Sequence, residues 1–224
     1  MTSSGSSLRG KVYQSIREEI LSGTYQEGEE LVEASLGEKL GVSRTPVREA
    51  LRQLALEDLV NIIPNKGAFV KGIAAEDVED IYIIRSKLEG LCARWAAKRV
   101  TEEELAAMEE VICLSEFHAQ REHYERVYEQ DTHFHELLYE ASHSRMLSTL
   151  LSQYHQYVQK VRKLTIQNHR RSTMSSDEHK GILDAIRDQD EDRAERLATQ
   201  HILNTMENLE QYDIDTLLHQ KTEI

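Results

Sequence analysis

The most constraining feature of this sequence is the uneven distribution of the residues that interrupt helices. Both prolines and eight of the ten glycines precede residue 73, whereas the following 152 residues contain only Gly90 and Gly181. Glycine and proline are the two least favourable residues in a helix interior. The sequence therefore predicts two domains: a short, turn-rich one at 1–73 and a helical one at 74–224.

Hydrophobic periodicity predicts the elements of both regions. The first region is expected to form three helices and a hairpin, at about 11–22, 32–40, 44–57 and 60–70. Thr101 with Glu104, and Ser175 with Glu178, match the capping-box pattern at two helix starts in the second region. The second region is expected to form helices at about 75–99, 102–118, 121–141, 146–168, 177–188 and 191–216.

The formal net charge of −13 argues at first sight against a nucleic-acid-binding protein, because Lys and Arg side chains must neutralise phosphates. Residues 1–74 contain 9 Lys and Arg against 10 Asp and Glu, whereas residues 75–224 contain 18 against 30. The acidity therefore belongs to the second region, and the first region can present a local basic surface.

Composition also limits location and chemistry. There is no run of 18 apolar residues, and the N-terminal MTSSGSSLRG lacks the apolar stretch of a signal peptide. We therefore expect a cytoplasmic protein with no membrane partner. Cys92 and Cys113 lack CxxC spacing, so two reduced, packed thiols are expected rather than a disulfide or a thiolate metal site.

Residues 36–51, LGEKLGVSRTPVREAL, have the pattern of a helix-turn-helix. This motif needs a small residue where its helices cross and a residue that adopts positive φ in the turn. Gly37 and Gly41 meet these two needs. Ser43 can cap the second helix, and Pro46 falls in its first turn, where a missing N–H costs little.

The second helix of such a motif enters the DNA major groove, and here it carries Arg44, Thr45 and Arg48 at its N-terminal end. Arginine can bond to a guanine edge or clamp a phosphate, and the sequence leaves open which arginine does which. The next segment has β-branched runs around a Pro-Asn-Lys-Gly turn, which predicts a wing with Lys66 and Gly67 at its tip. A purely structural helical hairpin with solvated arginines is the alternative.

The string GVSRTPVREAL at 41–51 resembles the signature of the GntR family of bacterial transcription regulators, and the resemblance extends over about 12–70. Ala34 is a departure, because many members carry a polar or basic residue there. The resemblance implies that five residues contact DNA: Arg44, Thr45, Arg48, Lys66 and Gly67.

Polar side chains interrupt the apolar faces of several helices in the second region. Asp131 and His135 lie one turn apart on one stripe, and His179 and His201 lie on apolar faces of two later helices. Buried polar groups need partners, and a structural hydrogen-bonding role is one possibility for each histidine. Three imidazoles and one carboxylate also form a ligand set for a divalent transition metal, with zinc favoured over nickel or manganese. The other histidines lack this pattern, and His133 is expected to be exposed.

The spacing of these four residues resembles that of the FCD effector domain in the FadR subfamily of GntR regulators, over about 75–215. The resemblance implies an all-helical pocket with a metal ion at its bottom, held by Asp131, His135, His179 and His201. It also implies that the effector is a small carboxylic acid. A match at all four positions is typical of the metal-containing branch.

Arg85 interrupts the apolar stripe of the helix expected at 75–99. One hypothesis is that it binds an effector carboxylate, since a bidentate arginine and an open metal position would hold an acid from two sides. The other is an i,i+4 ion pair with Glu89 on the helix surface. The sequence does not favour one over the other.

The expected fold class is mainly α, with an N-terminal winged helix-turn-helix followed by an all-helical, FCD-like antiparallel bundle. The predicted function is a ligand-responsive, DNA-binding transcription regulator, with repression preferred over activation. Its expected partners are double-stranded operator DNA, a small carboxylate effector and a second copy of the chain. A metal-sensing regulator is the main alternative. A metallohydrolase has less support, because no inward carboxylate is clearly placed as a general base.

Overall fold

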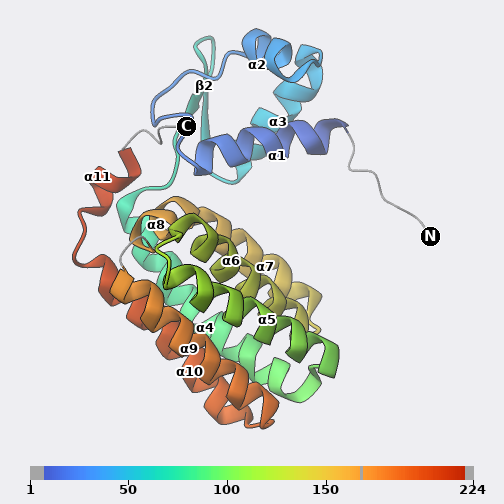
Figure 1. Ribbon diagram of the computed structural model, residues 1–224. Coiled ribbons are helices and arrows are strands. Elements are labelled where there is room, and N and C mark those ends of the chain that lie inside the picture. Colours follow the sequence, from blue (N-terminus) through green and yellow to red (C-terminus); the bar gives the residue numbers. More distant parts are fainter. Residues whose placement is uncertain (1–7, 167–168, 220–224) are drawn as a thin grey trace. The chain divides into compact units, whose positions relative to one another are not determined.

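The computed structural model describes residues 8–166 and 169–219 of the chain (Figure 1). Contacts divide it into two compact units, one built mainly from the residues up to Ala74 and one formed by Ala75–Leu217. The described residues are mainly helical with one two-stranded sheet, which confirms the expected fold class. No described helix is both long and apolar enough for a membrane crossing.

The first unit consists of three helices and a hairpin, in the expected order. The third helix is central, because it packs against the first two helices and against the first strand. The two strands are antiparallel, with Val60 opposite Val70 and Ile63 opposite Gly67. The elements are α1 (Leu8–Leu21), α2 (Glu33–Leu40), α3 (Arg44–Leu56), β1 (Val60–Ile63) and β2 (Gly67–Val70).

The turn between α2 and α3 has the geometry that its glycines predict. Gly41 ends α2 with a φ of 66°, in the left-handed region that glycine adopts without strain. A Cβ atom on Gly37 would lie 2.9 Å from the carbonyl oxygen of Val42, so a side chain does not fit at this crossing. Ser43 is the N-cap residue of α3, but its side chain makes no capping hydrogen bond, and that part of the expectation was wrong.

The wing turn between β1 and β2 is closed by a hydrogen bond in which the Lys66 N–H donates to the Ile63 carbonyl at 3.0 Å. Asn65 has a φ of 61° and Gly67 a φ of 125°. Only glycine adopts the second of these values readily. The predicted hairpin and its turn are therefore confirmed.

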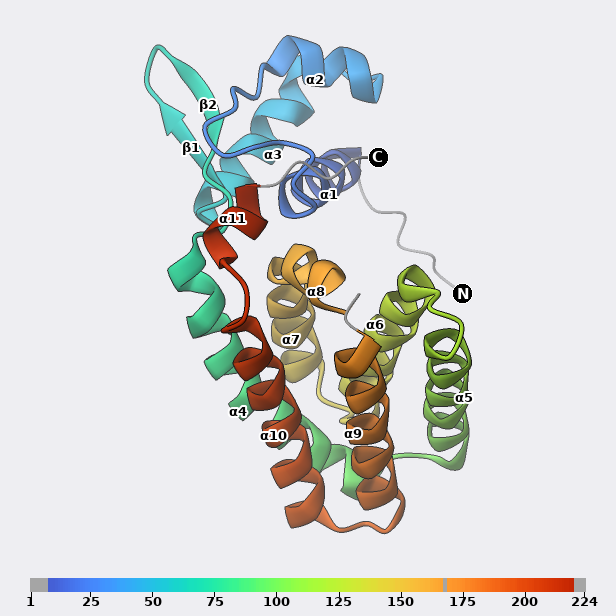
Figure 2. The ribbon, with the colours of Figure 1, turned by 60° about the vertical axis from the view of Figure 1, so that its left-hand side comes forward.

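The second unit is a helical bundle whose long helices run side by side in both views (Figures 1 and 2). The longest helix, α4, packs most extensively against α10 and also contacts α6, α7 and α9, while α5 packs against α6 and α9. The elements of this part of the chain are α4 (Ala75–Arg99), α5 (Glu102–Ala119), α6 (Tyr124–Ala141), α7 (Arg145–Tyr157), α8 (Gln159–Thr165), α9 (His169–Arg187), α10 (Glu191–Leu209) and α11 (Ile214–His219).

One of the two expected capping boxes is present. Thr101 accepts a hydrogen bond from the Glu104 N–H at 3.2 Å, and the Glu104 carboxylate accepts one from the Thr101 N–H at 2.8 Å. The second box was wrong, because α9 begins at His169 and its residues 175 and 178 lie inside the helix. The side chains of Ser175 and Glu178 bond to other helices instead, so tertiary partners replace the local cap.

Two further helices begin or end at residues other than those expected from the sequence. The segment expected as one helix at 146–168 forms α7 and α8, which meet at Val158 with φ −97° and ψ 10°. No glycine or proline marks this break, and the fully buried Val158 indicates that packing sets it. The last long helix ends at Leu209 rather than near 216.

The core of the bundle is built from apolar side chains of six helices, α4, α5, α6, α7, α9 and α10. Burial of each large apolar side chain contributes about 1.5–3 kcal/mol. Cys92 belongs to this core, as expected, whereas Cys113 is exposed, which corrects the expectation of two packed thiols. The largest fully buried apolar members are Met108, Phe134, Leu138, Tyr139, Leu151, Ile182 and Ile186.

Candidate functional site

The N-terminal end of α3 presents two exposed arginines that share one carboxylate. The Arg44 and Arg48 side chains are 65% and 50% exposed. Arg48 donates two hydrogen bonds to Glu33 of α2, both at 2.7 Å, and Arg44 Nη2 donates a third at 3.3 Å. The hydrogen bonds from Arg48 lower the pKa of Glu33, so it is a carboxylate at neutral pH. Sequence reasoning missed Glu33, although its place in the helix before the turn was a usable signal.

A groove of about 460 Å³ lies between α3 and the wing within the first unit. Arg44, Arg48 and Gly67 line this groove, so the structure brings three of the five expected DNA-contacting residues together. Thr45 and Lys66 are exposed beside it but are not part of its lining. A recognition helix and a wing that bind DNA together require cations on the surface between them, and Arg44 and Arg48 lie on that surface here.

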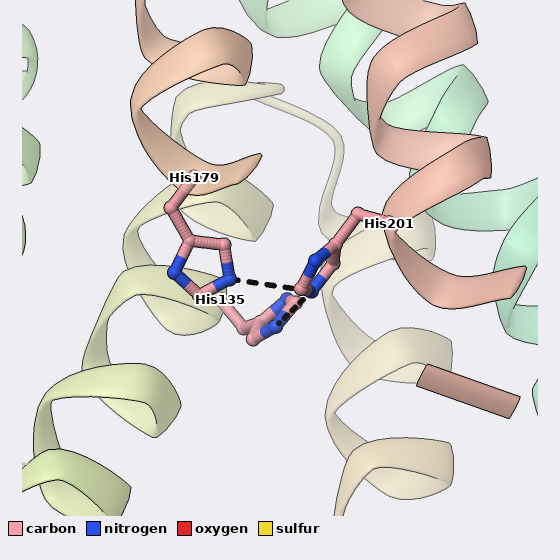
Figure 3. Close-up of side chains that lie close together, drawn as sticks. All are labelled: His135, His179 and His201. Atoms are coloured by element: carbon pink, nitrogen blue, oxygen red, sulfur yellow. Dashed lines mark hydrogen bonds between the residues drawn. The ribbon is translucent and has the colours of Figure 1, made fainter. Parts of the chain in front are cut away.

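Three histidines from three helices converge inside the second unit (Figure 3). His135 of α6, His179 of α9 and His201 of α10 are each buried, with 2–3% exposure. The Nε2 atoms of His179 and His201 lie 3.2 Å apart, and those of His201 and His135 lie 3.4 Å apart. A tetrahedral zinc ion with Zn–N bonds near 2.0–2.1 Å separates its ligand nitrogens by about 3.4 Å. The three nitrogens therefore have the spacing of a metal ligand set.

Asp131, the fourth expected ligand, lies beside this cluster. Its Oδ1 atom is 3.8 Å from His179 Nε2 and accepts a hydrogen bond from Ser175 Oγ at 3.3 Å. Its Oδ2 atom accepts a hydrogen bond from Arg162 of α8. Burial alone would raise the pKa of Asp131, but Arg162 and the nearby histidines bring it well below its usual value. The structure thus brings the three histidines together and places Asp131 next to His179, at the edge of that group.

Carboxylates lie on the far side of two of the rings, and one of them, Glu178, is hydrogen-bonded to its ring. His135 Nδ1 lies 2.9 Å from Glu89 Oε2, and His201 Nδ1 lies 2.7 Å from Glu178 Oε2. A carboxylate at one ring nitrogen directs the lone pair of the other nitrogen toward a metal. Burial would raise the pKa of Glu178, but the bond to His201 and other contacts lower it to about 2. This donor set fits a divalent transition metal.

Burial disfavours the charged form of two of the three histidines, His179 and His201. Burial lowers the pKa of His179 well below the usual imidazole value, and the neighbouring His201 adds to the effect. Burial also lowers the pKa of His201, although the hydrogen bond to Glu178 opposes this change. A neutral imidazole has the free lone pair that a metal ligand needs.

A cavity of about 30 Å³ adjoins the cluster. Its volume corresponds to about two water molecules. Apart from arginines, its lining includes Asp131, His135, His201 and Ser175, with Ile166 and Ile202. Three arginines line it: Arg85, Arg162 and Arg171.

Arg85 does form the expected ion pair with Glu89, at 2.7 Å, but both side chains are only 1% exposed. The hypothesis of a surface pair was therefore wrong about its surroundings. Burial alone would lower the pKa of Arg85 and raise that of Glu89. Their mutual attraction overcomes burial, so the pKa of Arg85 is raised and that of Glu89 is lowered. The Arg85 guanidinium is thus a fixed cation in the cavity wall.

Sequence reasoning missed His155 of α7, which is buried between two arginines. Its Nδ1 atom lies 3.3 Å from both Arg85 Nη2 and Tyr139 Oη, and its Nε2 atom contacts Arg162. Burial and the two guanidinium groups lower its pKa well below the usual value. Leu147, Leu151 and His155 follow one another at intervals of four residues and form the buried face of α7. This spacing was the signal that could have identified His155.

Arg162 and Arg171 were also missed, and nothing local in the sequence distinguishes them. Arg171 of α9 bonds to Glu178 at 3.0 Å and to Thr205 Oγ1 of α10 at 2.7 Å. Long side chains such as these reach partners on other helices, which periodicity does not reveal.

The expectation that His133 is exposed is confirmed.

Two family models match the chain in the same order as its two units. The model described as "Bacterial regulatory proteins, gntR family" matches residues 8–70. The model described as "FCD domain" matches residues 80–204, which is more than half of the chain.

Curated relatives and solved structures agree with these matches. An uncharacterized HTH-type transcriptional regulator, YdhC of Bacillus subtilis, is 30% identical over 199 residues, which are 88% of each chain. The HTH-type transcriptional repressor RspR of Escherichia coli is 28% identical, over 90% of this chain and 88% of its own. The structure of Escherichia coli McbR/YncC has a TM-score of 0.75 at 20% identity, covers 92% of this chain and 98% of its own, and supports the fold.

These relatives are transcription regulators rather than enzymes, so a metallohydrolase finds no support among them. Both family models match in the order of the two units, and the relatives align along most of the chain. The chain is a DNA-binding transcription regulator that belongs to the gntR family of bacterial regulatory proteins and carries an FCD domain.

Proposed function

We propose that this regulator is a repressor whose helical unit binds a divalent metal together with a small carboxylic acid. The acid changes the affinity of the helix-turn-helix for operator DNA by a coupling free energy of about 1–3 kcal/mol. The observation that carries this proposal is the convergence of three Nε2 atoms beside a cavity lined by three arginines. Repression is favoured over activation because RspR, one of the relatives, is named as a repressor.

The metal ligands in this proposal are the Nε2 atoms of His135, His179 and His201 and the Oδ1 atom of Asp131. Four protein ligands of this type suit zinc, nickel or manganese, and zinc is favoured by the mainly imidazole set. When bound, the ion supplies a Lewis acid position for a carboxylate oxygen. Glu89 and Glu178 hold two of the rings in the ligating orientation.

The acid is bound between this centre and the arginines of the cavity wall. Arg85 is the sequence-based candidate, and Arg162 and Arg171 are the two that the structure adds. Guanidinium groups bind carboxylates with two parallel hydrogen bonds, which gives both affinity and orientation. A cavity of about 30 Å³ favours a small acid over a long acyl chain.

The DNA-reading part of the proposal assigns residues 1–73 to operator binding and 74–224 to effector binding and dimerisation. Five residues contact DNA in this proposal: Arg44, Thr45, Arg48, Lys66 and Gly67. One recognition helix reads only a few base pairs, so a homodimer on a two-fold operator is the expected active form.

The test measures metal content, acid binding and operator binding on the same samples. The operator is first selected from random double-stranded DNA with the purified protein. His179→Ala and His201→Ala are expected to lower the metal content from about one ion per chain and to abolish the response of operator binding to acid. His133→Ala is the matched control, because His133 is exposed on the same helix as His135. Both ligand variants are expected to bind operator without acid as the wild type does.

Two outcomes contradict the proposal in different ways. If metal-free protein binds acids with full affinity, the metal has no role in sensing. If metal alone changes operator affinity and carboxylates add nothing, the protein is a metal sensor, and the ion itself is the signal. Elemental analysis before and after reloading with zinc, nickel and manganese distinguishes these cases.

A further inference from the structure

Each of three buried or half-buried carboxylates in the second unit lies between an arginine and a histidine. The arginines line the cavity, and the histidines are the three rings that converge beside it. In the first set, Glu89 lies 2.7 Å from Arg85 and 2.9 Å from His135. In the second, Asp131 is paired with Arg162 and lies 3.8 Å from His179. In the third, Glu178 lies 3.0 Å from Arg171 and 2.7 Å from His201.

These sets have a simple charge balance. Three guanidinium groups offset three carboxylates, and the three histidines are neutral as ligands, so the cluster has no net charge. A divalent metal bound at the histidines therefore adds two positive charges that no side chain of the cluster offsets. Uncompensated charge in a buried site is costly, and a bound anion removes this cost only if its own charge matches.

A second observation concerns the hydrogen-bond donors of two arginines that line the cavity. Arg85 Nη1 is buried and has no hydrogen-bond partner among the described residues. Arg171 Nη1 donates a hydrogen bond to Glu178, and Arg171 Nη2 donates one to the neutral hydroxyl of Thr205 at 2.7 Å. A carboxylate oxygen can take up the first donor and compete with the hydroxyl for the second, because a charged acceptor forms the stronger bond.

We infer that the effector is a dianion, specifically a short dicarboxylic acid with one carboxylate at the metal and the other at Arg85 and Arg171. This inference rests on the proposed function and narrows it from carboxylic acids in general to those with two negative charges. The cavity measures about 30 Å³, so a short acid displaces less of its wall than a long one. A monocarboxylic acid of the same length leaves one positive charge and one guanidinium donor unmatched.

The experiment compares acids that differ in charge but not in length. Zinc-loaded full-length protein is titrated with malonate, succinate and glutarate, each beside its own monoamide, at neutral pH and fixed ionic strength. Calorimetry gives the dissociation constants, and operator binding gives the response. At least one diacid is expected to bind about tenfold or more tighter than its monoamide, because the amide removes one charge and keeps the shape.

Two variants connect this preference to the cavity. Arg171→Gln is expected to reduce the preference for the diacid several-fold, because one cation of the cavity wall is lost. Arg187→Gln, on the exposed part of the same helix, is the matched control and is expected to keep the full preference. Zinc content measured on every sample shows that the metal site is intact.

The outcomes separate this inference from the proposed function. Equal or tighter binding of the monoamides by zinc-loaded protein overturns the dianion and leaves a carboxylate effector in place. An unchanged preference in Arg171→Gln with full zinc content overturns the assignment of the second carboxylate. If zinc-loaded protein that binds operator takes up none of these acids, both the proposed carboxylate effector and the dianion are overturned.

Discussion

The two candidate sites of this regulator, one in each unit, pair arginine with carboxylate in opposite surroundings. In the first unit, Glu33 holds Arg44 and Arg48, whose side chains are half exposed or more. In the second, Arg85 and Glu89 are paired with 1% exposure each. The difference shows which contacts each unit can exchange during function.

An exposed ion pair contributes little to stability, because water solvates both partners nearly as well. The Glu33 contacts can therefore open at little cost, as the proposed DNA contacts of Arg44 and Arg48 require. A buried pair is different, since loss of one partner leaves an unsolvated charge. The Arg85 pair is consequently a fixed part of the cavity wall.

The largest expected effect comes from breaking the buried pair. Glu89→Gln leaves the Arg85 cation without its counter-charge and is expected to destabilise the protein by about 3–5 kcal/mol. Urea unfolding of metal-free protein measures this. Glu129→Gln removes one partner of an exposed pair with Arg126 and is the matched control, with a negligible effect expected. Similar stability of the two variants would show that burial does not distinguish the pairs.

The next effect concerns the exposed arginines themselves. Arg48→Ala and Arg44→Ala are each expected to weaken operator binding by about ten- to hundredfold, because both project from the groove-entering end of α3. The thermal midpoint and metal content are expected to stay those of the wild type. Lys98→Ala, at an exposed position of α4, is the control for a lost cation. Wild-type operator affinity in both arginine variants, in a mobility shift at fixed salt, would remove this helix from the reading role.

The smallest effect is expected from the carboxylate that the two exposed arginines share. Glu33→Gln removes a negative charge from the groove and leaves Arg48 only one of its two acceptor oxygens. Binding to random DNA is expected to strengthen roughly two- to fivefold at low salt, while the preference for operator over random DNA falls. Competition titrations at several salt concentrations measure both quantities. A strengthened preference for operator would show that Glu33 opposes, rather than orients, the reading arginines.

Local sequence rules were sufficient for the turn between α2 and α3 and for the cap of α5. Gly37 and Gly41 specify the crossing and the turn through sterics and backbone conformation alone, and the Thr101 and Glu104 cap forms within four residues. Helical periodicity also indicates that Asp131 and His135 face inward, because residues four apart share one face. These features depend on neighbours in the chain, so the chain alone determines them.

Only the tertiary structure decided which side chains meet. The break between α7 and α8 falls at the fully buried Val158 rather than at a helix-breaking residue. His155, Arg162 and Arg171 join the cluster through partners between seven and seventy residues away. Helical periodicity indicates which residues point inward but not which helix lies opposite them. Long arginine side chains also reach residues on neighbouring helices, which periodicity does not reveal. The pairing of cations with carboxylates around the cavity is therefore a property of the assembled bundle.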